Sequence, residues 1–221
     1  MDSDPREELL ALIGSLRSHI LYHRGLGVEA LPRSEQFSQT LAAVREELGE
    51  CRRCRLSKGR KNIVFGEGNE RARLLFVGEA PGYEEDIQGR PFVGKAGQLL
   101  TRIISAIGMT RHEVYITNVV KCHPPQNRVP EPDEIACCYP FLAKQLKTIR
   151  PKIICALGKA ATQTLLDTDA GITTIRGTFH TWERIPVMPT FHPAYLLRNP
   201  ERKRETWQDM QAIQRELAKV S

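Results

Sequence analysis

The sequence contains no run of about 18 apolar residues, the minimum for a membrane-spanning helix. Its acidic start, MDSDPREELL, also lacks the basic and apolar segments of a secretory signal peptide. We therefore expect a cytoplasmic protein with no membrane partner. Aromatic residues make up only 6% of the chain, yet its 41% hydrophobic and 26% charged residues are ordinary for a globular protein. A chain of 221 residues is long enough for one well-buried domain and short for two, and we expect a monomer.

The six cysteines are not expected to form disulfides, because thiols in the cytoplasm stay reduced. Cys51 and Cys54 form a C-x2-C pair, which presents two thiolates to a single metal centre. Cys122 and Cys138 enclose a segment of 15 residues and complete a set of four. Cys137 competes with Cys138, because adjacent residues on a helix point about 100° apart and only one can face the metal. Four thiolates suit zinc or an iron–sulfur cluster, so the residues alone leave the metal open.

Positive charge is concentrated beside the first cysteine pair, in the segment CRRCRLSKGRKN. The net charge of +6 points weakly to a polyanionic partner, and such a run is suited to follow a phosphate backbone. The basic residues of this segment are Arg52, Arg53, Arg55, Lys58, Arg60 and Lys61.

Short apolar segments alternate with helical segments along the centre of the chain. The expected strands are residues 73–77, 114–117, 152–157 and 185–190, and the expected helices are residues 96–107, 132–148 and 160–166. Strands joined by helices form right-handed βαβ units. We therefore predict an α/β fold, a three-layer α/β/α sandwich with a central four-stranded, mostly parallel sheet. Cys155 falls within an expected strand and is predicted to be a small buried hydrophobic residue.

The two ends of the chain are expected to be helical. Residues 1–45 are predicted to be a helical extension or linker, with helices at residues 5–23 and 34–48, and residues 46–221 are predicted to be the folded domain. A last helix at residues 202–219 is expected to pack on the core. Its expected core-facing stripe is Trp207, Met210, Ile213, Gln214 and Leu217.

Polar or Gly-rich turns follow three of the four expected strands. GEAPG follows the first strand, Asn118 the second, and HPAYLLR the fourth. Ligands bind beyond the carboxyl ends of the strands in sheets of this kind. The sequence therefore predicts a functional site at this edge of the sheet.

Four segments resemble the thermostable, iron–sulfur uracil-DNA glycosylases known as family 4. They are GEAPGYEED, GRPFVGKAGQLL, TNVVKCHPPQNRVP and FHPAYLLRNP, and they occur in the family's order within about residues 47–210. The resemblance implies a uracil-DNA glycosylase-like fold, uracil-containing DNA as the partner, and a monofunctional hydrolase that releases uracil and leaves an abasic site. It also implies one 4Fe–4S cluster with Cys138 as the last ligand, because that ligand stands two residues before a proline, here Pro140.

Matching positions imply roles for individual residues. Asn118 is expected to read the Watson–Crick edge of a flipped uracil, because its amide can donate to O4 and accept from N3–H. Phe92 is expected to stack on the ring. His192 is expected to donate to the uracil O2, where negative charge builds as the bond breaks, in either protonation state.

The turn at Gly78, Glu79 and Ala80 is expected to approach the substrate closely through its backbone. The best-studied uracil glycosylases carry an aspartate that orients the attacking water at the position of Ala80. Alanine cannot do this, so Glu79 is the candidate and the turn's backbone the alternative. Glu84, Glu85 and Asp86 are interpreted as a solvated helix start, and His123 and His180 receive no role.

The segment after His192 resembles the family's loop that wedges into the duplex beside the flipped base. The residues expected to contact DNA there are Pro193, Tyr195, Leu196 and Arg198, the last through a phosphate.

Two other functions remain open. One is a uracil-DNA binding protein that becomes covalently trapped, although the related cross-linking subgroup has an inserted basic loop where this chain has CHPPQNRVPEP. The other is a metal-stapled DNA-binding module without catalysis.

Overall fold

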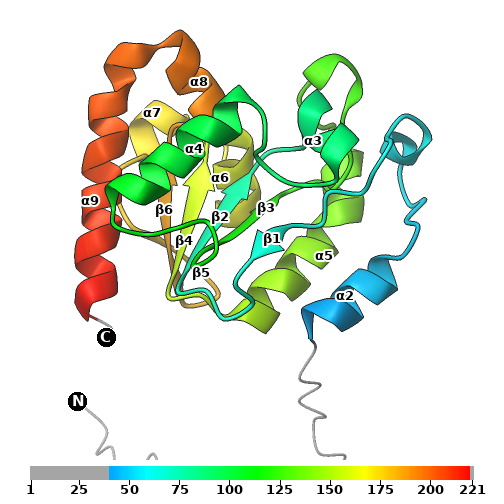
Figure 1. The fold of residues 1–221 in the computed structure, drawn as a ribbon, viewed down its shortest axis with the longest axis horizontal. Helices are drawn as coiled ribbons and strands as arrows, with labels where there is room; N and C mark the ends of the chain where they lie inside the picture. Colours follow the sequence, from blue (N-terminus) through cyan, green and yellow to red (C-terminus); the bar gives the residue numbers. More distant parts are fainter. Residues whose placement is uncertain (1–39, 220–221) are drawn as a thin grey trace, which may run out of the picture. The chain divides into compact units, whose positions relative to one another are not determined.

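The computed structural model describes residues 40–219, and the helix expected at residues 5–23 lies outside them. Within the described residues, one six-stranded sheet has the order β1-β3-β2-β4-β6-β5 (Figure 1). The four inner strands are parallel to one another, and each edge strand is antiparallel to the inner strand beside it. The strands are β1 (Glu67–Gly68), β2 (Leu74–Gly78), β3 (Tyr115–Asn118), β4 (Ile153–Leu157), β5 (His180–Trp182) and β6 (Ile185–Thr190).

Helices precede the first strand, connect the inner strands and follow the last strand. The α-helices are α2 (Leu41–Leu48), α3 (Tyr83–Gln88), α4 (Lys95–Ala106), α5 (Pro132–Ile149), α6 (Lys159–Leu166), α7 (Ile172–Ile175), α8 (Pro193–Arg198) and α9 (Lys203–Lys219). Within residues 40–219, the 3-10 helices are η1 (Arg55–Lys58), η2 (Pro125–Asn127) and η3 (Pro200–Arg202). No helix among residues 40–219 is long and apolar enough to cross a membrane.

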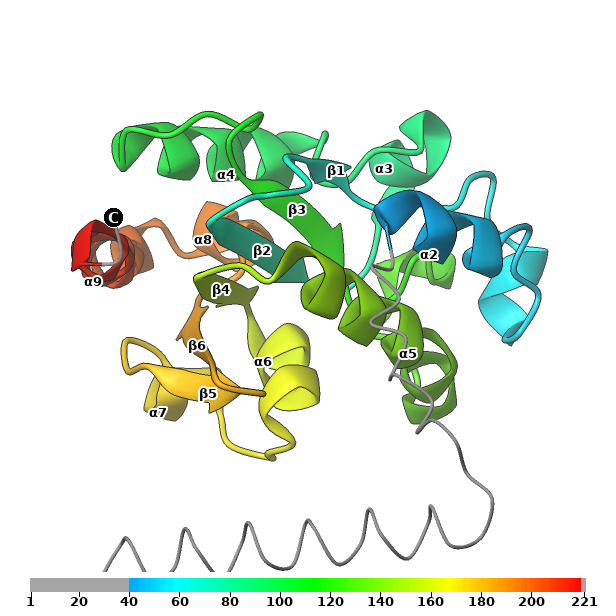
Figure 2. The ribbon, with the colours of Figure 1, turned by 90° about the horizontal axis from the view of Figure 1, so that it is seen from below.

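Both faces of the sheet are buried, because successive side chains of each parallel strand point to opposite faces. In β2, Leu75 and Val77 join a core with residues of α2, α5 and α6. Leu74 and Phe76 join a second core with residues of α4 and α9. Figure 2 shows these two helical layers on either side of the sheet. The predicted three-layer α/β/α sandwich is therefore confirmed.

The predicted strand number is wrong, because the structure adds two short antiparallel edge strands. β1 has only two residues, Glu67 and Gly68, which carry no apolar alternation. β5 joins β6 through Glu183 and Arg184, both at positive φ. Tight hairpin turns of this kind usually carry Asn-Gly or Asp-Gly, so the sequence offered no signal for this one. Cys155, by contrast, is completely buried in β4, as predicted.

The first and last helices of the described residues differ in part from the predicted ones. α2 begins at Leu41 and packs on α5 through Leu41, Val44 and Leu48, so the predicted domain boundary after residue 45 falls inside this helix. In α9, Met210, Ile213 and Leu217 are buried as predicted. Trp207 and Gln214 are exposed, so their predicted place in the core is wrong.

Candidate active site

The carboxyl ends of the parallel strands enclose a cavity of about 550 Å³. Pairing of β2 with β3 places Gly78 opposite Asn118, and β6 leads directly into His192. Seven residues singled out in the sequence line this cavity together: Glu79, Ala80, Phe92, Asn118, His192, Tyr195 and Arg198. The convergence predicted from the strand ends is thus present in the fold.

Asn118 presents a buried amide to the cavity. Its side chain is 1% exposed, and its Oδ1 atom has no hydrogen-bond partner among residues 40–219. The buried Lys121 ammonium donates to the Asn118 backbone carbonyl at 2.7 Å, which anchors the end of β3. A side chain at Gly78 would overlap both Asn118 Oδ1 and the Phe92 ring, so glycine is required beside them. An unpaired buried acceptor is costly, and a ligand with a matching donor removes that cost.

His192 is held as a neutral imidazole. The Ala194 N–H donates to His192 Nδ1 at 3.1 Å, so Nδ1 carries no proton and the proton sits on Nε2. Burial, together with the positive charge of Arg198, lowers the pKa of His192 to about 4. The structure therefore decides what the sequence left open: near neutral pH the side chain is a neutral Nε2–H donor.

Phe92 forms the cavity wall beside His192. The two ring centroids are 5.5 Å apart, and the ring planes are tilted by 35°. The ring also lies against Gly78, on the same side as the Asn118 amide. A flat ligand that contacts Asn118 therefore lies within reach of an aromatic surface and of an imidazole donor.

The GEAPG turn supplies a carboxyl group to the same cavity. Glu79 lines it, and burial raises the pKa of this carboxyl above its usual range. The turn is tied to the end of β3, because Val119 and Val120 donate backbone N–H groups to the carbonyls of Gly78 and Glu79. A carboxylate of raised basicity at this place can accept a proton from water.

Two of the residues predicted to contact DNA are buried, which contradicts that role for them. Pro193 occupies the first turn of α8, and Leu196 is completely buried against Leu99 and Phe191. The segment was predicted to be a loop that wedges into the duplex, and it is a short helix with an inner face. The adjacent Leu197 is 40% exposed and is the apolar side chain at the surface.

Glu85 and Asp86 are structural anchors and not the solvated residues predicted. Glu85 Oε1 accepts from Val93 N and Gly94 N at 2.9 and 3.1 Å, and Oε2 accepts from Gly82 N, so Glu85 joins two walls of the cavity. Asp86 is 3% exposed and accepts from two backbone N–H groups of residues 61–62. The G-x-x-E spacing of residues 82–85 resembles a capping box and was the available signal.

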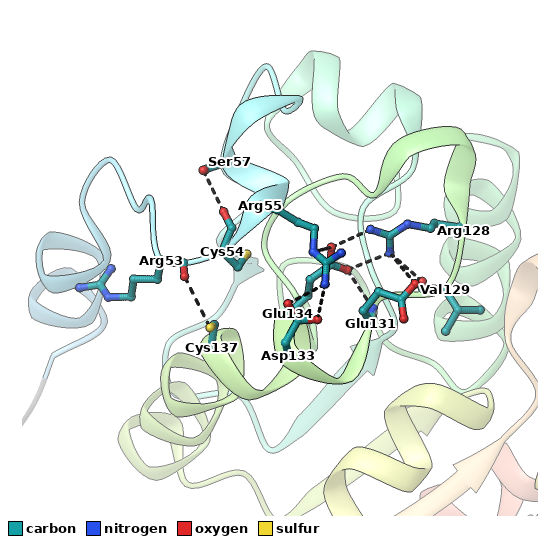
Figure 3. A network of polar contacts seen from close by, with 10 residues as sticks. All are labelled: Arg53, Cys54, Arg55, Ser57, Arg128, Val129, Glu131, Asp133, Glu134 and Cys137. Carbon is teal, nitrogen blue, oxygen red and sulfur yellow. Dashed lines mark hydrogen bonds and ion pairs between the residues drawn. The ribbon is translucent and has the colours of Figure 1, made fainter.

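The loop after Cys122 forms a further wall that the sequence reasoning missed. Pro124, Asn127, Arg128 and Val129 line the cavity. Arg128 donates to both carboxylate oxygens of Glu134 at 2.8 and 2.6 Å. His123, to which no role was given, ties the loop to the GEAPG turn through a 2.9 Å contact of Nδ1 with the Pro81 carbonyl. Figure 3 shows Arg128 and Arg55 converging on Glu134.

The four predicted cysteine ligands come from three segments. Cys51 and Cys54 precede η1, Cys122 follows β3, and Cys138 lies in α5. All six cysteines are free thiols. No three His, Cys, Asp or Glu side chains of residues 40–219 are arranged to hold one metal ion.

The surroundings of the cysteine sulfurs are polar and cationic. Arg60 donates to Cys122 Sγ and the Lys121 N–H donates to Cys138 Sγ, each at 3.3 Å. Burial raises the pKa of Cys122 to about 11. Burial also raises the pKa of Cys138, and the nearby Cys51 and Cys54 thiols add to that rise. Neighbouring thiolates repel one another, and the donors aimed at two of the sulfurs offset part of that charge, so the chemistry of these donors suits metal ligation although the side chains are not arranged around one ion.

The basic segment serves the fold as well as the surface. Arg53 stacks on Phe141 at 4.8 Å and donates to two carbonyls of α2, and Arg55 forms an ion pair with Asp133. The segment lines a surface cavity of about 700 Å³ that includes Arg52 and Lys58. The main role of Arg53, Arg55 and Arg60 is therefore structural: they hold the cysteine loop, which carries Cys51 and Cys54.

Comparison with known proteins agrees with this geometry. Residues 65–211 match the family model of the uracil DNA glycosylase superfamily. A type-4 uracil-DNA glycosylase of Saccharolobus solfataricus is 46% identical over 187 residues, which cover 80% of this chain and 87% of the relative. The chain belongs to the type-4 uracil-DNA glycosylases. A type-4 relative from Thermotoga maritima is 48% identical over 163 residues, covering 73% of this chain and 85% of the relative. One from Sulfurisphaera tokodaii is 46% identical over 188 residues, covering 81% and 85%.

Proposed function

We propose that this type-4 uracil-DNA glycosylase binds a flipped uracil in the cavity between Asn118, Phe92 and His192. The observation that carries the proposal is the buried Asn118 amide, whose Oδ1 has no partner among residues 40–219 and whose side chain lines the cavity. Oδ1 accepts the uracil N3–H and the amide N–H donates to O4. Cytosine has the opposite pattern at these two positions and leaves both groups unpaired, which excludes it.

Cleavage of the N-glycosidic bond places negative charge on the leaving uracil. The neutral His192 donates its Nε2 proton in a hydrogen bond to the uracil O2, while Phe92 stacks on the ring. The uracil leaves as its anion, and water adds to the sugar C1′ atom while Glu79 accepts the water's proton, a role that its raised pKa supports. Glu79 then returns this proton to the solvent, from which the uracil anion takes one up. The products are free uracil and an abasic site.

The surface beside the cavity is the proposed DNA interface. Arg198 lies at the cavity mouth and suits a phosphate, and the exposed Leu197 suits insertion into the base stack. Tyr195 lines the cavity and stacks on Phe191 at a centroid distance of 5.1 Å, which holds its ring at this surface.

The cysteine site is proposed to hold one 4Fe–4S cluster through Cys51, Cys54, Cys122 and Cys138. The donors to Cys122 and Cys138 support this set, since hydrogen bonds to the sulfurs are a regular feature of such centres. Cys137 contacts the Arg53 carbonyl through its Sγ atom at 3.6 Å instead. When bound, the cluster staples the cysteine loop to α5 and supplies no step of the reaction. A cytoplasmic location is part of the proposal, because thiols stay reduced there and remain available as ligands.

Substitution of Asn118 by leucine tests the base-reading role. The variant keeps a similar volume but loses two hydrogen bonds, so we expect the excision rate for uracil to fall roughly 10- to 100-fold. Single-turnover rates on a uracil-containing oligonucleotide, read as alkali-labile strand breaks, measure this. Oligonucleotides with thymine or cytosine at the same position and the variant's melting temperature serve as controls. An unchanged uracil rate in a folded variant contradicts the proposal.

The basic segment of residues 51–62 is proposed to contact DNA phosphates as well, and substitution of Arg52 and Lys58 by alanine tests this. Each loss of a phosphate contact is expected to weaken DNA binding and to lower the slope of log K against log salt by about 1. Fluorescence anisotropy at several salt concentrations measures the slope. Lys152→Ala is the matched control, because this exposed lysine immediately precedes β4 at the end of the sheet away from the cavity. Equal slopes in all variants would remove this segment from the interface.

A further inference from the structure

The backbone of Phe92 is strained. Its φ angle is 53°, in the left-handed region that residues with a side chain rarely adopt. The following helix α4 packs tightly on this turn, since a side chain at Gly97 would overlap the Phe92 carbonyl. Conformations of this kind persist only where the surrounding structure holds them, and they concentrate at functional sites.

Arg111 holds the strained turn at Phe92 in place. Its Nη1 donates to the Phe92 carbonyl at 3.0 Å and its Nη2 donates to the Pro91 carbonyl at 2.8 Å. The side chain is 17% exposed and forms an ion pair with Glu67, which is 23% exposed. Glu67 in turn lies in the edge strand β1, opposite Ile116 of β3. The guanidinium thus connects the sheet edge to two consecutive carbonyls of the strained turn.

We propose that Arg111, oriented by Glu67, is a positioning residue for the glycosylase reaction that fixes the Phe92 ring against the flipped base. The inference rests on the proposed stacking role of Phe92. The ring lies beside Gly78 and the Asn118 amide and 5.5 Å from the His192 ring, so any shift of the turn changes its position relative to both groups. Lysine cannot reproduce the hold, because only the planar guanidinium presents two fixed donors to two acceptors.

A double-mutant cycle tests this inference. The variants are Arg111→Met, Phe92→Ala and the double variant, each measured by single-turnover excision from a uracil-containing single-stranded oligonucleotide. Misplacement of a reacting partner by about 1 Å can cost up to about 100-fold in rate, so we expect Arg111→Met to be about 10- to 100-fold slower. In the Phe92→Ala background, the same change is expected to have almost no further effect, because the ring that Arg111 positions is gone.

Two further variants separate positioning from folding. Arg90→Met removes the other ion-pair partner of Glu67, at 2.8 Å, and is expected to leave the rate within about twofold, because the contacts of Arg111 with the turn remain. Arg111→Lys keeps the charge and is expected to restore only part of the rate, and it replaces Arg111→Met in the cycle if that variant does not fold. Melting temperatures accompany every rate.

The outcomes distinguish the two proposals. Equal slowing by Arg111→Met with and without the Phe92 ring would show that Arg111 acts elsewhere and overturn the inference alone. An unchanged rate in Phe92→Ala would overturn the stacking role and this inference together. An unchanged rate in a folded Arg111→Met variant would overturn the inference and leave the stacking role standing.

Discussion

Replacement of His192 by alanine is expected to slow uracil release by about 100- to 1000-fold, the usual effect of removing one donor from a developing negative charge. DNA binding should be nearly unchanged, because the hydrogen bond to O2 strengthens mainly in the transition state. Single-turnover rates and equilibrium anisotropy on the same uracil-containing oligonucleotide separate the two effects. His112→Ala is the matched control, since this histidine is exposed and does not line the cavity.

The pH dependence follows from the neutral state of His192. Its pKa is lowered from 6.5 to about 4 in the folded protein, so the side chain binds fewer protons when folded than when unfolded between these values. The stability that this difference contributes is complete above about pH 6.5 and is lost as the pH falls towards 4. The free energy of unfolding of His192→Ala should therefore approach that of the unaltered protein as the pH falls. His192 should also cause no inflection in the excision rate between about pH 6 and 8.

Two results would contradict this account of His192. Turnover that survives in a folded His192→Ala variant would show that leaving-group stabilisation comes from another group. A rate that rises or falls steeply near pH 6.5, and loses this dependence only in His192→Ala, would show that the imidazole titrates normally. The hydrogen bond from the Ala194 N–H, which requires an unprotonated Nδ1, would then be lost below that pH.

Replacement of Cys138 by serine is expected to remove the metal centre and destabilise the protein by more than about 4 kcal/mol, as loss of a structural metal typically does. For a chain of this size, that corresponds to a fall in melting temperature of roughly 8 to 16 °C. Cys138 is buried in the same apolar cluster as Cys122, and in the proposed centre it joins α5 to the cysteine loop, so its loss would remove the link between distant parts of the chain.

The adjacent Cys137 is the matched control. Cys137→Ser changes the same atoms one residue earlier, but this thiol contacts the Arg53 carbonyl, and we expect the metal content and melting temperature to stay close to those of the unaltered protein. Broad visible absorbance and iron analysis measure the centre. Retained absorbance in Cys138→Ser together with its loss in Cys137→Ser would exchange the two assignments. A colourless protein with bound zinc would reject the cluster and leave the four-cysteine site.

Much of the candidate site could be predicted from the sequence, because its residues stand at the ends of recognisable strands. Runs such as LLFV (residues 74–77) and IICAL (residues 153–157) are apolar throughout, as expected of strands buried on both faces, and the parallel arrangement brings their carboxyl ends together. Asn118, Phe92 and His192 therefore meet in one cavity, as expected from the motifs that contain them.

The residues whose burial was predicted wrongly lie where the local sequence does not indicate what packs against them. Leu196 and Leu197 are chemically identical, and only the packing of α8 on Leu99 and Phe191 decides which one is buried. Asp86 stands in a run of acidic residues that resembles a solvated helix start, yet backbone N–H groups from residues 61–62 enclose its carboxylate. The short edge strands β1 and β5 depend on pairing with longer neighbours and carry little signal of their own.

The sequence by itself determined the layered fold, the positions of the four candidate cysteine ligands and the residue types of the cavity. Apolar periodicity and motif spacing can be read from the sequence without knowledge of the fold. Only the tertiary structure decided the neutral tautomer of His192, the lack of a partner for the Asn118 acceptor among residues 40–219, and the contacts of Arg111 with the strained Phe92 turn. These properties depend on burial and on hydrogen-bond partners that are distant in sequence, such as Glu67 for Arg111. Chemical function in this protein therefore depends on residue types that the sequence shows, and on protonation and hydrogen-bonding states that packing imposes on them.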